Sequence, residues 1–153
     1  MDKEERFCMD ETLNHMNRVR SLLIDVMSNM TRRGINHDKS KLEDPEFSTF
    51  VEYTPKLKKM EYGSDEYKKC LEGMKPALDH HYKNNDHHPE SNLFGLDGMS
   101  LMALMEMLAD WRAATERHRK GDIMESIEKN QERFGYSDNI KSILKTTVRE
   151  LGW

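Results

Sequence analysis

The chain has 153 residues, of which 24 are basic and 28 acidic, and its formal net charge is −4. This length predicts one domain, residues 1–153, and the absence of a long basic block argues against a binder of duplex nucleic acid. No apolar run is long enough for a membrane span, and the acidic start MDKEERFCMDE lacks the apolar region of a signal peptide. With only Cys8 and Cys70 as thiols, far apart in the sequence, these features favour a cytoplasmic protein with reduced cysteines.

Helical periodicity runs through the whole chain, whereas strand signals are almost absent. The first helix is expected to end at Gly34 and to face a core with residues spaced three and four apart: Leu13, Met16, Val19, Leu22, Leu23, Val26, Met27 and Met30. Residues 36–53 predict a short helix interrupted around Pro45, because proline lacks the donor N–H. A third helix is expected over residues 64–82, with an inward line formed by Tyr67, Leu71, Met74, Leu78 and His81.

The second half of the chain alternates a loop with capped helices. Residues 84–98 have the Asn, Asp, Pro and Gly content of a structured loop. Ser100 can cap a helix over residues 101–120, which is apolar on more than one side and therefore belongs near the middle of a bundle. Asp122 and Ser137 can cap two further helices. The sequence therefore predicts an all-α fold, a single-domain bundle of about five or six helices.

Four of the seven histidines lie in ALDHHYKNNDHHPE, residues 77–90. His81 continues the inward line of its helix, while His80 is turned away by about 100° around the helix axis. We therefore prefer His81 to His80 as a ligand. His87 and His88 follow in the loop, where Pro89 stiffens the backbone.

Three more positions carry candidate ligands. His15 shares the apolar stripe of the first helix, the His37-Asp38 pair follows Gly34, and Asp110 lies in an apolar helix, where an unpaired carboxylate is costly. Each has a structural alternative, such as a core histidine at position 15. Together, inward-facing imidazoles and carboxylates favour a bound Fe, Mn, Zn or Ni ion, and the lack of cysteine ligands argues against structural zinc.

Several stretches of the chain match known patterns. The order His15, His37-Asp38, His81, His87-His88, Asp110 resembles the signature H…HD…H…HH…D of the bimetallic branch of the HD-domain superfamily. HDKSK, ending at Lys41, is similar to the HD-x-[GS]-K of that superfamily. The chain also resembles a small family of bacterial and phage proteins with the stretches HDxSK, HYxxNxHHPE and EMLADWxAA. No GYP sequence follows the histidine loop, unlike in the cyclic-dinucleotide branch.

The resemblance implies an HD-like helical domain with two divalent transition metal ions. Iron or manganese is the first choice, and nickel, cobalt or zinc are alternatives. The first ion would be held by His15, His37, Asp38 and Asp110. The second would be held by His81, His87 and His88, with Asp38 bridging the two ions.

The activity implied by the resemblance is that of a metal-dependent phosphohydrolase. Its substrate would be a small, nucleotide-like phosphomonoester or phosphodiester, attacked by a water that the two metals activate. Asp38 and Lys41 would be catalytic, with Lys41 contacting the substrate phosphate; the alternative for Lys41 is a surface charge in the first turn of a helix. Arg112 and Arg117 are weaker candidates for binding the phosphate, because either could instead pair with a glutamate.

Two other functions are open at this level. The first is an HD-type mixed-valent di-iron oxygenase, whose ligand order is nearly the same. The second is a non-catalytic nucleotide- or metal-binding protein. Further along the chain, Asn130, Arg133 and Tyr136 could line a pocket or simply pack, and Trp111 is expected to pack. The oligomeric state is open as well.

Overall fold

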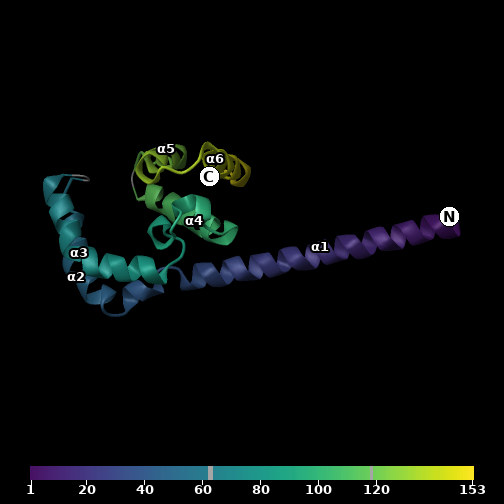
Figure 1. Ribbon diagram of the computed structural model, residues 1–153, viewed down its shortest axis with the longest axis horizontal. Helices are drawn as coiled ribbons and strands as arrows, with labels where there is room; N and C mark the ends of the chain where they lie inside the picture. The colour runs from purple at the N-terminus through teal and green to yellow at the C-terminus, as the bar shows by residue number, and fades with distance from the viewer. Residues whose placement is uncertain (62–63, 118) are drawn as a thin grey trace. The chain divides into compact units, whose positions relative to one another are not determined.

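The computed structural model describes residues 1–61, 64–117 and 119–153, and the regular structure of these residues is entirely helical (Figure 1). The elements are α1 (Lys3–Asn36), η1 (Lys39–Leu42), α2 (Glu46–Leu57), α3 (Asp65–Asn84), η2 (Pro89–Ser91), η3 (Gly95–Gly98), α4 (Leu101–Glu116), α5 (Ile123–Phe134) and α6 (Asp138–Leu151). The η elements are short 3-10 helices. The prediction of an all-α fold is therefore confirmed for the described residues.

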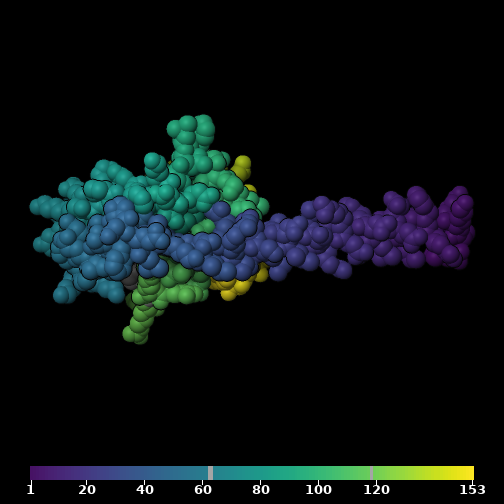
Figure 2. Space-filling model, turned by 90° about the horizontal axis from the view of Figure 1, so that it is seen from below, coloured from purple at the N-terminus to yellow at the C-terminus, as the bar shows by residue number. Residues whose placement is uncertain are grey.

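The chain divides into two units, residues 1–36 and residues 37–153, and each is described by itself. The first unit is α1, which continues to Asn36 instead of ending at Gly34. A glycine inside a helix costs only about 1 kcal/mol, so one glycine does not end a long helix. No residue of α1, drawn in purple to blue in Figure 2, is buried, and all but the half-buried Asn29, Met30 and Arg33 are exposed. The expected core-facing role of the apolar stripe is therefore not observed, and a single domain stays a prediction.

The main core of the second unit lies among α4, α5 and α6. α4 packs on α5, and α5 packs on α6 (Figure 1). The buried residues of this core are Leu96, Leu104, Met107, Leu108, Ile123, Ile127, Tyr136, Leu144 and Val148. α4 has buried residues on several of its sides, as its all-round apolar character predicts.

Polar caps fix where these helices begin. Ser100, Asp122 and Ser137 each accept a backbone N–H from the first turn of the following helix, as predicted. α4 ends at Glu116, earlier than the expected residue 120; residue 118 lies outside the described residues. The chain then turns so closely that a Cβ on Gly121 would lie 1.9 Å from the carbonyl oxygen of Thr115.

α2 and α3 pack on each other and on η1. The helical path is interrupted at Pro45, as expected: η1 ends before it and α2 begins directly after it. The first residue of α2, Glu46, is fully buried. The buried residues of α3 are Cys70, Met74, Ala77 and His81. This face is slightly rotated from the predicted line, because Leu71 and Leu78 are only half-buried. The packing brings the histidine-rich end of α3 beside the turn that follows α1 in the sequence.

Candidate metal centre

The centre begins at the turn formed by His37 and Asp38. Asp38 has φ 57° and ψ 15°, in the left-handed region that few residues other than glycine adopt. Nε2 of His37 lies 3.6 Å from Oδ2 of Asp38. η1 then returns the chain so that Lys41 Nζ lies 2.5 Å from the same oxygen. This turn places an imidazole, a carboxylate and an ammonium group side by side.

Three imidazoles from the end of α3 and the following loop surround the other oxygen of Asp38. Nε2 of His81 lies 3.2 Å and Nε2 of His87 lies 3.5 Å from Asp38 Oδ1. Nε2 of His88 is 2.8 Å from Nε2 of His81. These four groups, His81, His87, His88 and Asp38 Oδ1, are named the imidazole half. Their potential ligand atoms lie within 4.8 Å of one another, close enough to hold a metal ion.

Two atoms of the imidazole half are buried without a hydrogen bond. Among the described residues, Asp38 Oδ1 and His87 Nε2 have no hydrogen-bond partner, although the two atoms face each other. The side chain of His87 is only 2% exposed. Buried polar atoms are nearly always paired in folded proteins. The unpaired oxygen and nitrogen therefore fit a group that coordinates a cation.

A second set of groups surrounds His37. Its Nε2 lies 3.7 Å from Asp110 Oδ1 in addition to its contact with Asp38 Oδ2, and its Nδ1 donates a hydrogen bond to Glu106 Oε1 at 2.9 Å. These groups, His37, Glu106, Asp110 and Asp38 Oδ2, are named the carboxylate half. Asp110 and Glu106 lie one turn apart on α4. His37, His87 and Glu106 are also close enough to one another to hold a metal ion.

Glu46 supports the imidazole half from behind. Its Oε2 accepts a hydrogen bond from Nδ1 of His81 at 2.8 Å and one from Ser40 Oγ at 3.0 Å. Its Oε1 accepts from Nδ1 of His80 at 2.8 Å. A carboxylate on the outer ring nitrogen fixes the tautomer and leaves the other nitrogen free to coordinate. Glu46 therefore directs His81 Nε2 towards Asp38, and it holds His80 outside the cluster.

Glu106 supports both halves at once. One of its oxygens, Oε1, lies 2.9 Å from Nδ1 of His37 and 3.2 Å from Nδ1 of His87. Neither Glu46 nor Glu106 was predicted from the sequence to belong to the centre. For Glu106, the available signal was a second carboxylate in the same apolar helix as Asp110. For Glu46, no periodic or spacing signal connects it with His81, which lies 35 residues further on.

The pKa values of His37 and His88, one histidine from each half, are shifted in opposite directions. The nearby carboxylate of Asp110, and then that of Glu106, raise the pKa of His37 to about 9 against the effect of burial. Burial, together with the nearby His87 and His81, lowers the pKa of His88 to about 3. Burial alone would raise the pKa of Asp38, but His81, His87 and Lys41 hold it well below its usual range.

The cationic residues proposed for the substrate phosphate lie in different places. Lys41 lies beside Asp38, with Nζ 5.4 Å from the ring centre of Phe50. Arg112 pairs with Glu116 at 3.3 Å, which is the alternative expected for it. Arg117 is exposed just after the end of α4. The structure therefore brings Lys41 to the centre, while Arg112 pairs within its own helix.

The remaining candidates divide in the same way. His15 is exposed on α1 in the first unit, and its role as a ligand stays a prediction. Asn130 and Arg133 line a pocket beside the centre. Tyr136 is a core residue whose hydroxyl donates to the carbonyl oxygen of Ile127 at 2.6 Å. Trp111 packs against the core, as expected.

These observations define an all-helical protein with a buried cluster of histidines and carboxylates that is close enough to hold a metal ion. The chain belongs to the family of unknown function DUF5662, whose pattern matches residues 4–151. Neither the curated proteins nor the solved structures contain a match to this chain. None of the helices described combines the length and the apolar character that crossing a bilayer requires.

Proposed function

We propose that the protein is a cytoplasmic, metal-dependent phosphohydrolase that acts on a small, nucleotide-like phosphate ester. The observation that carries this proposal is the imidazole half, where three ring nitrogens and one carboxylate oxygen meet. Asp38 Oδ1 and His87 Nε2 lack hydrogen bonds among the described residues, which fits ligands better than structural side chains. The resemblance of the histidine and aspartate order to the HD-domain superfamily supports the same activity.

The two halves would hold two divalent ions, iron or manganese first. His37, Asp38 and Asp110 would hold one ion, and Asp38 would share the other with the three histidines of the imidazole half. When bound, such ions lower the pKa of an attacking water and neutralise charge on the phosphoryl oxygens. Neutral imidazoles with carboxylates are a ligand set that suits these metals.

The protein's own groups would prepare this reaction. Asp38 directs one oxygen at each half, so it is placed to bridge them. His88 is neutral at physiological pH because of its lowered pKa, about 3, so its ring nitrogen is available as a ligand. The ammonium group of Lys41 adds a positive charge beside Asp38, where it would stabilise negative phosphoryl oxygens.

The first test compares Asp38→Asn with Asp79→Asn. Asp79 is an exposed aspartate of α3 that pairs with Lys75, so its variant controls for the loss of one carboxylate. Metal content and hydrolysis of an aryl phosphate with Mn²⁺ are measured for both variants. Asp38→Asn should lose bound metal and at least about 100-fold in kcat/KM, whereas Asp79→Asn should match the wild type. Full metal retention by Asp38→Asn would show that the ligand assignment is wrong.

The same assay separates the competing functions. The mixed-valent di-iron oxygenase would use nearly the same ligands, so hydrolysis is measured with and without dioxygen. Turnover that is unaffected by removing oxygen supports the phosphohydrolase. Two bound irons with an oxygen-dependent spectroscopic signal would instead support the oxygenase. If metal-loaded wild type has no turnover and Asp38→Asn only lowers the Tm, the metal has a structural role.

A further inference from the structure

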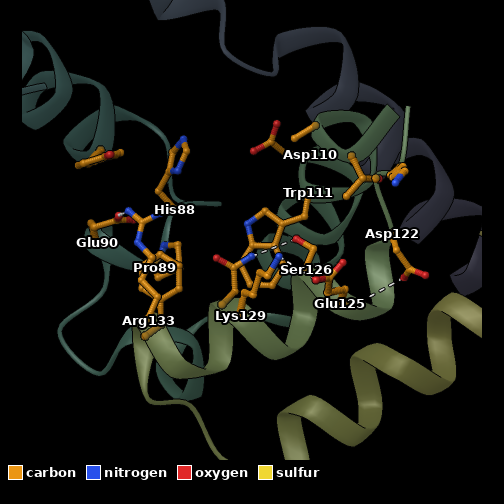
Figure 3. A pocket seen from close by; sticks show the side chains of 17 residues that line it. His88, Pro89, Glu90, Asp110, Trp111, Asp122, Glu125, Ser126, Lys129 and Arg133 are labelled. Carbon is orange, nitrogen blue, oxygen red and sulfur yellow. Dashed lines mark hydrogen bonds and ion pairs between the residues drawn. The ribbon is translucent and has the colours of Figure 1, made fainter. Parts of the chain in front are cut away.

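A pocket of about 570 Å³ adjoins the metal centre (Figure 3). His88 and Asp110, one from each half of the centre, belong to its lining. Its other walls come from η2, from α4 and from the face of α5 that carries Ser126, Lys129 and Arg133 (Figure 3). The volume is within the range of about 300–1,000 Å³ that is typical of small-molecule sites. A phosphate ester held at the centre would therefore extend its organic part into this pocket.

Away from the centre, the charges of the pocket wall balance one another. Arg133 on α5 pairs with Glu90 of η2 at 3.1 Å, and Lys129 pairs with Glu125 at 2.8 Å. The connection between α4 and α5 adds one charge of each sign, from Lys120 and Asp122. A wall with equal numbers of cations and carboxylates gives no net attraction for further phosphates. It therefore favours an organic part that is uncharged.

The pocket also presents aromatic surfaces and neutral hydrogen-bonding groups. The ring centroids of Tyr82 and His88 are 5.0 Å apart, next to the centre. Trp111 and Phe134 have nearly parallel rings, with centroids 6.4 Å apart, and both line the pocket. Ser126 and Asn130 supply a hydroxyl and an amide from α5. Aromatic faces beside neutral hydrogen-bonding groups suit a ring that carries hydroxyl or amide functions.

We propose that this pocket binds the uncharged, ring-bearing alcohol of a phosphomonoester whose phosphoryl group lies at the metal centre. This inference rests on the proposed phosphohydrolase function and narrows its substrates to monoesters without a second phosphate. Aromatic rings of nucleosides and saturated rings of sugars share this chemistry. The alcohol alone has no group for the metals, so it binds with or without them.

The test measures binding of two neutral probes, adenosine and methyl glucoside, by calorimetry, with glycerol as the acyclic control. The full chain is used both with Mn²⁺ and after treatment with EDTA. Adenosine or methyl glucoside should bind at least about tenfold more tightly than glycerol in both states, because only the rings contact the aromatic walls. Adenosine as the better probe identifies a nucleoside, and methyl glucoside identifies a sugar. Binding of neither ring would overturn the inference.

A matched pair of variants on α4 locates the binding. Ala114 lines the pocket, whereas its neighbour Ala113 is exposed and lies outside the lining. Ala114→Leu should fill the pocket and weaken binding of the better probe about tenfold or more, and Ala113→Leu should leave it unchanged. Ser126→Leu fills the pocket from α5 and replaces Ala114→Leu if that variant does not fold. Unchanged binding in folded pocket variants would overturn the assignment of the pocket.

The balanced charges of the pocket wall can be tested separately. Adenosine monophosphate should bind the Mn²⁺-loaded protein at least as tightly as adenosine diphosphate. Glu90→Gln leaves Arg133 without its carboxylate partner. The variant should therefore raise the affinity for the diphosphate roughly threefold to tenfold relative to the monophosphate. Glu132→Gln is the control: it removes an exposed charge of α5, the helix that carries Arg133, outside the pocket lining. It should leave the relative affinities for the two nucleotides unchanged. A wild type that prefers the diphosphate would overturn the inference.

Failure of the inference and failure of the proposed function give different results. Binding of the neutral probes to the EDTA-treated protein requires no metal and no turnover. If the aryl phosphate is not hydrolysed but adenosine still binds in the pocket, the pocket assignment holds and the phosphohydrolase is wrong. If the aryl phosphate is hydrolysed but neither ring binds, the phosphohydrolase holds and the pocket assignment is wrong.

Discussion

The two halves of the centre share Asp38 but surround it with opposite chemistry. In the carboxylate half, three carboxylates surround one imidazole, and the pKa of His37 is raised to about 9. In the imidazole half, three imidazoles surround one carboxylate oxygen, and the pKa of His88 is lowered to about 3. At neutral pH, without metal, His37 therefore carries a proton and His88 does not. The imidazole half is ready to bind a cation, whereas the carboxylate half must first release a proton.

The largest expected effect comes from removing a ligand of the imidazole half. His81→Gln should reduce metal affinity there by more than about 100-fold, because it removes the nitrogen that faces Asp38. His80→Gln is the matched control, since His80 Nδ1 bonds to Glu46 and its side chain is 41% exposed. Metal content after dialysis is measured for both variants. Equal loss of metal in the two variants would contradict the choice of His81.

A smaller effect is expected from the two supporting glutamates. Glu106→Gln should weaken metal binding in both halves by about 10- to 100-fold, because its oxygen bonds to both His37 and His87. Glu46→Gln should weaken only the imidazole half, where it holds His81. Titration with Mn²⁺ against a coloured chelator would separate the two proposed sites. If Glu46→Gln weakened both sites to the same degree, the division of the centre into two halves would be wrong.

The smallest expected effect is the pH dependence of the free energy of unfolding of the metal-free protein. The folded pKa of His88, about 3, lies below its unfolded value of about 6.5, so the free energy of unfolding falls as pH drops below 6.5. Between about pH 6.5 and 5 this loss reaches up to about 2 kcal/mol. The folded pKa of His37, about 9, lies above 6.5, so its stabilisation is complete below pH 6.5 and lost as pH rises towards 9.

Urea denaturation of EDTA-treated protein checks this dependence. The urea midpoint should be highest near pH 6.5 and should fall on both sides. His88→Gln should flatten the acid side, and His37→Gln should flatten the alkaline side. A midpoint that does not change between about pH 5 and 9 would contradict the opposite pKa shifts of the two halves.

The sequence predicted where helices begin better than it predicted what packs against them and where they end. Apolar spacing and N-caps such as Ser100 and Asp122 are local signals, and they predicted the first residues of α4 and α5 correctly. The same spacing in α1 indicated an apolar face, but it carries no information about what covers that face. The end of α4 was also missed, because it depends on the close approach of Gly121 to Thr115, a contact made by the folded backbone.

The residues of the centre were predictable where the phase of one helix determines which side chain faces inward. They were unpredictable where residues far apart in the sequence come into contact. The phase of α3 separates His81 from His80, and the structure places only His81 in the imidazole half. The bond between Glu46 and His81 depends on the packing of α2 against α3. No local pattern encodes that packing. The assignment of two metals and of the phosphate chemistry rests on the resemblance and stays a proposal, and the role of His15 as a ligand stays a prediction.

The left-handed backbone of Asp38 restricts which side chains position 38 can carry. Glycine, asparagine and aspartate adopt this conformation readily, whereas alanine or glutamate would be strained there. Of these three, only aspartate supplies a negative charge. Glutamate keeps the charge but adds a methylene group and backbone strain, so Asp38→Glu should not bind metal as the wild type would. Local backbone geometry and ligand chemistry thus specify the same residue independently.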